Sequence, residues 1–259
     1  MSPPQLIRSA RVTLAAASLA LLAIPFALIV LLVQARWAPL LGIDHGARDN
    51  LHRYAVNHSG FVTAMQLISD SGSAVAWSVM LTPAVGWLLW RRLPRLALFV
   101  VITAIGSSLL NSLVKATVDR QRPVLTNPVA REHGLSFPSG HAQAAIVGFA
   151  VLLIVLAPIL RGVWRRTAVT TAVLAVMAIG FSRVALGVHY LSDVLGGLVL
   201  GAAWVAAMSA AFDVFGADRE HRARVSASRS AGRSAGRSAA GPEPLGGTCS
   251  GQEVLDDPG

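Results

Sequence analysis

Long apolar runs separated by short polar segments are the feature that most restricts what this chain can fold into. Of its 259 residues, 54% are hydrophobic and 14% are charged, which is unusual for a soluble domain. Six runs each approach the roughly 20 residues that cross a bilayer as a helix. They are residues 12–34, 73–90, 96–114, 142–160, 167–181 and 194–212. Because a helix bonds its own backbone in lipid, we predict an all-α, polytopic membrane protein with six transmembrane helices.

Lysine and arginine between the runs predict the orientation. Short arginine-bearing turns follow the second and fourth runs, at residues 91–95 and 161–166. Most of the 22 Lys and Arg residues lie on the side of the N-terminus, these two loops and the C-terminal segment. The positive-inside rule therefore places both termini in the cytoplasm. Heavy use of Ala, Gly and Arg is typical of a GC-rich bacterium, so we expect a multi-pass protein of the plasma (inner) membrane.

The composition changes after the last run, which predicts two parts. Residues 1–215 form the six-helix transmembrane domain, and residues 216–259 form a disordered cytoplasmic tail rich in Ser, Ala, Gly and Arg. The net charge of +9 does not predict a nucleic-acid partner, because the basic residues stand between apolar runs or in the tail. We expect the lipid bilayer as their partner, and the sequence gives no indication of an oligomeric state.

Three polar clusters interrupt the apolar background. They are KATVDRQRP (115–123), PSGH (138–141) and SRVALGVHYLSD (182–193). In the six-span layout these clusters fall at the ends of helices 3 to 6, and all of these ends face the extracytoplasmic side. The arrangement predicts one polar site at that end of the bundle.

The spacing within two clusters predicts pairs of side chains. Lys115 and Arg122 are seven residues apart, so one helix would carry both on the same face, about 10 Å apart along its axis. Side chains of that length reach a shared anion. His189 and Asp193 are four residues apart, hence neighbours on one helical face. The carboxylate would then accept a proton from one ring nitrogen and leave the other free and nucleophilic.

The PSGH cluster predicts an anion-binding helix start. Ser139 follows Pro138 at the expected N-cap, so the backbone N–H groups of Gly140 and His141 are left for an anion. Each cluster alone has a structural alternative: cations that reach the interface, a simple helix cap, or a structural His–Asp hydrogen bond. Together with Arg183, which otherwise is an interface anchor, they predict a pocket for a tetrahedral dianion.

These residues resemble the type 2 phosphatidic acid phosphatase superfamily, to which the soluble vanadium haloperoxidases are also related. Its signature is Lys-x6-Arg-Pro, then Pro-Ser-Gly-His, then Ser-Arg-x5-His-x3-Asp. Between residues 115 and 193 the chain matches every position. The matched residues are Lys115, Arg122, Pro123, Pro138, Ser139, Gly140, His141, Ser182, Arg183, His189 and Asp193.

The resemblance implies a catalytic role for His189, His141 and Asp193. His189 attacks phosphorus and carries a phosphohistidine, Asp193 orients it, and His141 protonates the leaving group. The resemblance also implies that the phosphoryl oxygens are held by Lys115, Arg122, Ser139, Gly140 and Arg183. No metal and no other cofactor is expected. The implied substrate is a lipid phosphate or diphosphate in the membrane: phosphatidic acid, phosphatidylglycerol phosphate or a polyprenyl diphosphate.

Three points stay open at this stage. The same pocket would suit a membrane protein that binds or transports a lipid head group without catalysis, and a small sugar phosphate is a weaker substrate candidate. Arg120 either contacts the second phosphate of a diphosphate or is an ordinary surface arginine. Specificity is expected in the first loop, residues 36–60.

Overall fold

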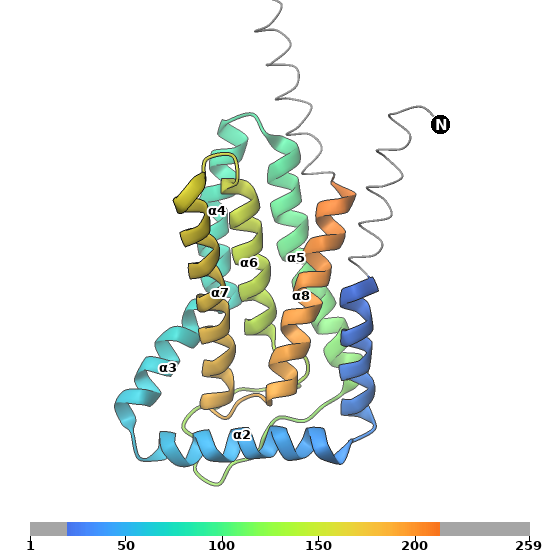
Figure 1. Cartoon of the computed structure of the whole chain (residues 1–259), viewed down its shortest axis with the longest axis vertical. Helices are drawn as coiled ribbons and strands as arrows, with labels where there is room; N and C mark the ends of the chain where they lie inside the picture. The colour runs from blue at the N-terminus through green and yellow to red at the C-terminus, as the bar shows by residue number, and fades with distance from the viewer. Residues whose placement is uncertain (1–19, 213–259) are drawn as a thin grey trace, which may run out of the picture. The chain divides into compact units, whose positions relative to one another are not determined.

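The computed structural model describes residues 20–212, which are helices joined by loops (Figure 1). Within these residues there is no strand, so the all-α prediction is confirmed for this part of the chain. The start of the first predicted run and the predicted tail, 216–259, lie outside the described residues. After a first helix, Ala20–Gln34, the helices are α2 (Ala38–Val56), α3 (Ser59–Ser71), α4 (Ala74–Trp90), α5 (Pro94–Val118), α6 (Gly140–Leu156), α7 (Gly162–Ala185) and α8 (Leu191–Ala211).

Several of these helices are suited to cross a membrane. In the described residues, α5, α7 and α8 are long and apolar enough by themselves. Two bent pairs also qualify, Ala20–Gln34 with α2 (88°) and α3 with α4 (43°), which raises the number to 5 if each pair is one span. The chain is therefore a multi-pass membrane protein. Six spans also require α6, an apolar helix of 17 residues, to cross, and this number stays a prediction.

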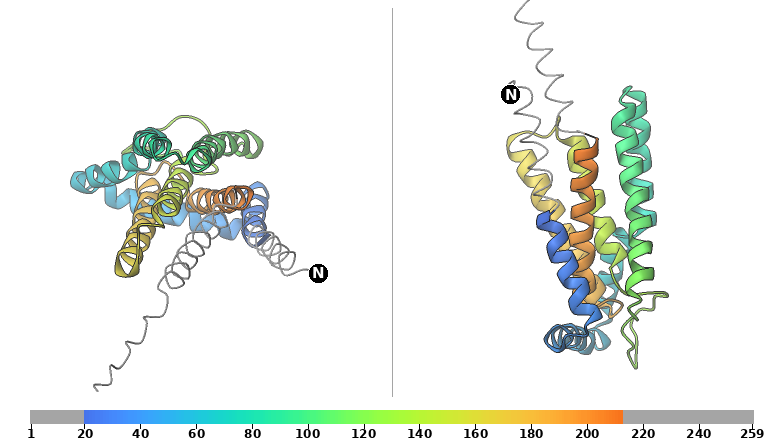
Figure 2. Two further views of the ribbon diagram at one scale, coloured as in Figure 1. Left: turned by 90° about the horizontal axis from the view of Figure 1, so that it is seen from above. Right: turned by 90° about the vertical axis from the view of Figure 1, so that its right-hand side faces the viewer.

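Helix α2 crosses the end of the bundle and does not run along it (Figures 1 and 2). Most of the connection over residues 36–60, between the first and second predicted runs, is α2, a helix that the apolar runs did not predict. Asp44 and Ala55 are its two buried residues, and Ala47 and Leu51 pack against the bundle. Positions 44, 47, 51 and 55 follow helical spacing, a stripe that identifies the buried face. A search for continuous apolar runs does not detect a stripe of this kind, because its residues are three or four positions apart.

Helix α6 packs against α4, α5, α7 and α8. Its start lies close to α8 because Gly197 has no side chain. A Cβ at Gly197 would lie 2.5 Å from the backbone oxygen of Ser139. Small residues permit such close approach of helix backbones in membranes. This contact holds the beginning of α6 beside the beginning of α8.

On another side, α6 receives the indole of Trp77 from α4. Trp77 is buried and meets Phe149 edge to face, with ring centroids 4.8 Å apart. The indole lies over Gly148, and a Cβ at that position would overlap its six-membered ring. The α4–α6 contact thus depends on a glycine at position 148.

We expect Gly148→Ala to lower the melting temperature of the purified protein in detergent. The added methyl group overlaps a ring that buried neighbours hold in place, and overpacking of this kind costs about 1–3 kcal/mol. Gly86→Ala on α4 is the matched control, since a Cβ there meets no atom within 4 Å. A melting temperature for Gly148→Ala as high as that of Gly86→Ala would contradict the described packing.

Candidate active site

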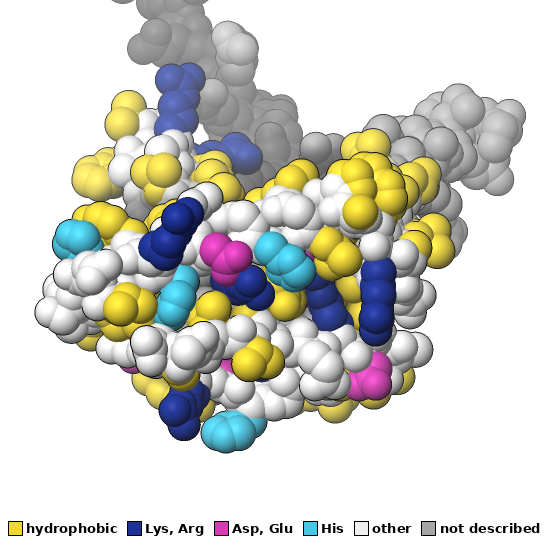
Figure 3. Space-filling model, turned by 90° about the horizontal axis from the view of Figure 1, so that it is seen from below, with side chains coloured by type: hydrophobic (Ala, Val, Ile, Leu, Met, Phe, Trp, Pro, Cys, Tyr) yellow, Lys and Arg dark blue, Asp and Glu magenta, His cyan; other side chains and the backbone are white. Residues whose placement is uncertain are grey.

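The three predicted clusters meet at one end of the bundle. This end is formed by the C-terminal ends of α5 and α7, the N-terminal ends of α6 and α8, and α2 (Figure 1). Figure 3 looks onto this end and shows basic, acidic and histidine side chains gathered on it. Chain segments far apart in sequence therefore contribute to one polar site.

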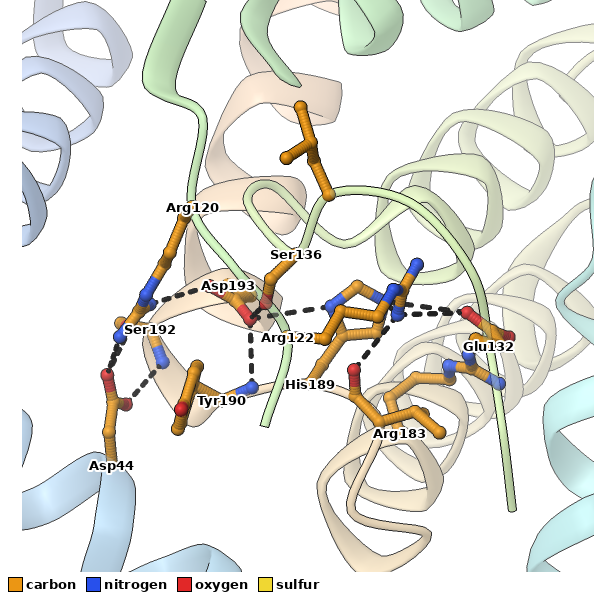
Figure 4. Close-up of polar contacts among 12 residues, drawn as sticks. Asp44, Arg120, Arg122, Glu132, Ser136, Arg183, His189, Tyr190, Ser192 and Asp193 are labelled. Atoms are coloured by element: carbon orange, nitrogen blue, oxygen red, sulfur yellow. Dashed lines mark hydrogen bonds and ion pairs between the residues drawn. The ribbon is translucent and has the colours of Figure 1, made fainter. Parts of the chain in front are cut away.

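His189 is 1% exposed and lies in the loop between α7 and α8. Its Nδ1 is 3.4 Å from the Oδ2 atom of Asp193, and its Nε2 is 3.1 Å from the Nη1 atom of Arg122 (Figure 4). Because a guanidinium only donates, Nε2 accepts and the ring proton sits on Nδ1, facing the carboxylate. Burial lowers the pKa of His189 to about 4, and Asp193 offsets only part of this effect. At neutral pH the imidazole is therefore uncharged.

The geometry of this pair differs from the predicted one. Helix α8 begins at Leu191, so His189 precedes the helix and the two residues do not share a helical face. They meet because the Asp193 carboxylate folds back toward the residues before the helix. Its Oδ2 accepts a 2.9 Å hydrogen bond from the backbone N–H of Tyr190. A first-turn acid that bonds the N-cap backbone is a common helix start.

The prediction that Lys115 and Arg122 share one helix face is wrong. Helix α5 ends at Val118, and Asp119 has a left-handed backbone with φ of 48°. Pro123 also disfavours helical geometry in the residue before it. Arg122 therefore lies in the loop after α5, while Lys115 stays in its last turn.

Lys115 and Arg122 support the loop that connects α5 to α6. The Nζ of Lys115 donates to the backbone oxygen of Leu135 at 2.9 Å. Arg122 donates from Nε to the backbone oxygen of Gly134 at 3.1 Å and from Nη1 to that of Val188 at 2.9 Å. These bonds hold the loop against the segment that carries His189.

Glu132 is a residue of the site that the sequence reasoning missed. Its carboxylate lies 3.0 Å from the Nη1 atom of Arg122, forms an ion pair with Arg183, and is 4.0 Å from the Nε2 atom of His189. Arg183 also donates to the hydroxyl of Ser69 in α3. Burial opposes ionisation of Glu132, but Arg183 and Arg122 outweigh it and hold the pKa of Glu132 below its usual value. The available signal was weak: Glu132 is the one acidic residue between Arg120 and Ser139.

The PSGH segment forms the start of α6. Ser139 occupies the N-cap, as expected, but its hydroxyl does not cap the helix. Within residues 20–212, the buried Oγ of Ser139 has no hydrogen-bond partner. The first N–H groups of a helix also lack intrahelical acceptors. His141, half-buried at the second position of α6, faces the charges of Glu132 and Arg183.

Asp193 is bound on several sides. Its Oδ1 accepts from the Nη1 atom of Arg120 at 2.6 Å, and its Oδ2 accepts from the hydroxyl of Ser136. Arg120 also donates to Asp44 and Ser192. It is not a surface arginine, because its side chain is 11% exposed.

Two hollows open beside Glu132. One, of about 260 Å³, is also lined by Arg122 and Val188. The other, of about 300 Å³, extends to Arg183 and Ser69. The first hollow thus opens onto Arg122 and the second onto Arg183, and Glu132 lies at both.

Comparisons with known proteins agree with this arrangement. The model of the PAP2 superfamily matches residues 95–216. The chain is 40% identical over 96 residues to phosphatidylglycerophosphatase B of Bacillus subtilis (strain 168), a match that covers 36% of this chain and 46% of that relative. It thus spans less than half of the length of that protein. It is 25% identical over 191 residues to undecaprenyl-diphosphatase of Sulfolobus acidocaldarius, with 70% of this chain and 87% of that protein covered.

A solved structure has the same fold. It is the first transmembrane PAP2 type phosphatidylglycerolphosphate phosphatase from Bacillus subtilis, with a TM-score of 0.62 and 22% sequence identity. The superposition covers 78% of this chain and 96% of that one. The family match over 95–216 contains every predicted site residue, from Lys115 to Asp193. Residues 95–216, just under half of the chain, thus resemble the PAP2 superfamily.

Proposed function

We propose that the protein is an integral-membrane lipid phosphatase that hydrolyses a phosphomonoester or diphosphate lipid through a phosphohistidine on His189. One observation carries the proposal. The imidazole of His189 is buried and uncharged. Its Nδ1 atom faces the carboxylate of Asp193, and Arg122 and Arg183 lie on the side of its Nε2 atom. A nucleophile beside preorganised cations suits phosphoryl transfer, in which charge on the phosphoryl oxygens must be held.

In the first step, Nε2 of His189 attacks phosphorus and the bond from phosphorus to the lipid oxygen breaks. The leaving oxygen takes a proton from His141, and Asp193 balances the positive charge that develops on the His189 ring. Arg122 and Arg183 hold the phosphoryl oxygens, aided by Lys115, the unpartnered hydroxyl of Ser139 and the N–H of Gly140 at the start of α6. For a diphosphate substrate the leaving group is the lipid monophosphate.

In the second step, water attacks the phosphohistidine. His141, now neutral, takes a proton from this water, and the bond between phosphorus and Nε2 breaks. Orthophosphate leaves and the imidazole of His189 is restored. The two steps need an acid, a base and a nucleophile, which the two histidines supply, and no step calls for a metal.

The substrate class follows from the membrane setting and the relatives. The site lies at helix ends, where a lipid head group at the bilayer surface has access. The similar proteins are named for phosphatidylglycerol phosphate and undecaprenyl diphosphate, so these lipids and phosphatidic acid are the substrates to compare. We propose an extracytoplasmic site in the plasma membrane with both termini in the cytoplasm, as the distribution of Lys and Arg favours.

We expect His189→Ala to lower lipid phosphate turnover by at least about 10³-fold, because the nucleophile is lost. The measurement is phosphate release from the three lipids in detergent, with EDTA present. His58→Ala, a change at an exposed histidine between α2 and α3, is the control and should retain activity. Turnover that survives in folded His189→Ala would contradict the proposed nucleophile.

The two histidines can be separated by trapping the phosphoenzyme. With a terminally 32P-labelled polyprenyl diphosphate, whose lipid monophosphate leaving group depends least on the acid, His141→Ala should accumulate base-stable, acid-labile label, since loss of the base slows hydrolysis of the phosphohistidine. His189→Ala should show no label. Tight lipid binding by the wild-type protein without phosphate release would instead favour the alternative, a non-catalytic head-group binding or transport protein.

We expect Glu132→Gln to lower the inhibition constant of orthophosphate severalfold at pH 7. The Glu132 carboxylate occupies the two arginines that we assign to the phosphoryl group, so a phosphate must displace it. The amide removes a competing charge of the same sign and keeps the shape. Asp49→Asn, a change at an exposed acid of α2 that lines neither hollow, is the control. An unchanged or higher inhibition constant for Glu132→Gln would rule out this competition.

A further inference from the structure

A second buried carboxylate lies behind the His189–Asp193 pair. Asp44 of α2 is 0% exposed, and its side chain faces the start of α8. It accepts hydrogen bonds from the Nη2 atom of Arg120 at 2.8 Å, from the backbone N–H of Ser192 at 2.9 Å and from the hydroxyl of Ser192 at 2.5 Å. Removing a carboxylate from water is costly, and these donors compensate that cost and fix the orientation of the Asp44 side chain.

Arg120 joins the two carboxylates. Its Nη1 is 2.6 Å from Asp193 and its Nη2 is 2.8 Å from Asp44 (Figure 4). Its guanidinium also lies over the ring of Tyr190, with Cζ 4.2 Å from the ring centroid. A planar fork of donors suits such a bridge, and a lysine ammonium does not reproduce it. The guanidinium of Arg120 is therefore held by two carboxylates at its edge and by the Tyr190 ring against its face.

We propose that Arg120 and Asp44 are positioning residues for the reaction: they hold Asp193 in place and keep its negative charge directed at His189. The inference rests on the proposed function, since it gives a role to the partner of the proposed nucleophile. Neither residue lines the hollows beside Glu132. They act through Asp193 and have no described contact with Arg122 or Arg183, the arginines proposed to hold the phosphoryl group.

The charges explain why two acids share one arginine. If Arg120 paired with Asp193 alone, the guanidinium would cancel the carboxylate that must balance a positive His189 ring. Asp44 binds Nη2 of Arg120 while Asp193 binds Nη1, and two carboxylates with one guanidinium keep one net negative charge. Through Asp193, this charge stabilises the imidazolium of the phosphoenzyme. Asp44 also joins α2 to the catalytic pair, because Asp44 and Ala55 are the only buried residues of that helix.

The test compares Asp44→Asn and Arg120→Gln in the full-length protein. Both should lower kcat by about 10- to 100-fold, by analogy with the effect of residues that orient metal ligands. The inhibition constant of orthophosphate should stay within about twofold of wild type, because Arg122 and Arg183 are unchanged. Asp49→Asn is the matched control on the same helix: Asp49 is exposed and pairs with Arg48 at 2.7 Å. It should leave kcat unchanged.

The pH dependence separates positioning from a merely structural effect. The charged groups that face His189 are Asp193, Arg122, Arg183, Glu132 and His141. In Asp44→Asn, Arg120 offsets more of the negative charge of Asp193. The protonated His189 ring is then less stable, so the acid limb of the pH profile of kcat/KM moves to lower pH. In Arg120→Gln, no cation offsets the charge of Asp193. The carboxylate then stabilises the protonated His189 ring more strongly, and the acid limb moves to higher pH. Each shift should be about half a unit to one unit.

Each outcome decides the proposal. Opposite pH shifts with lower kcat and an unchanged orthophosphate constant support it. Wild-type kcat in both variants, shifts in the same direction, or an orthophosphate constant that rises as kcat falls would overturn it. Arg120→Lys keeps the charge and serves if Arg120→Gln does not fold; wild-type kcat in Arg120→Lys would also overturn the two-sided bridge. Full activity in His189→Ala would instead refute the proposed function itself.

Discussion

A carboxylate buried among apolar helices is stable only when donors surround it, and Asp193 meets this requirement in a way that organises the whole site. Its side chain binds Arg120, the hydroxyl of Ser136 and the backbone N–H of Tyr190. Its own backbone oxygen accepts a 2.9 Å hydrogen bond from the N–H of Ser139. One residue thus ties the starts of α6 and α8 to the loop between α5 and α6. A shift of Asp193 would be transmitted to His189, the start of α6 and Arg120 together.

The apolar helices contribute by setting distances. Because Gly197 lets the backbones of α6 and α8 approach, the N–H of Ser139 can reach the backbone oxygen of Asp193. The costly polar groups lie at helix ends, where water and head groups limit the cost of their desolvation. In the described part of the chain the spans therefore act as a frame, and the residues proposed for catalysis lie at the ends of four helices and in the loops between them.

The sequence predicts the helices and the meeting of the clusters, because apolar length and chain order determine which ends lie together. It does not predict how each side chain reaches the site. Helix α5 ends at Asp119, whose backbone is left-handed, so Arg122 lies in the loop that follows. No local sequence pattern predicts this helix end. Glu132 and Asp44 are single acids in segments without a catalytic signature. Their partners lie 51 and 76 residues away along the chain, so only tertiary structure identifies them.

The balance of charges distinguishes the arginines that the sequence alone treats as equivalent. Arg120 has two carboxylates, Asp44 and Asp193, so no positive charge is left over for a ligand. Arg122 and Arg183 share the one carboxylate of Glu132, so this pair keeps a net positive charge. In a medium of low dielectric such an excess attracts an anion strongly. A phosphoryl dianion that replaces Glu132 would neutralise the pair, while Arg120 stays bound to its acids. We therefore expect the same residue type to serve as support in one place and as a ligand-binding group in the other.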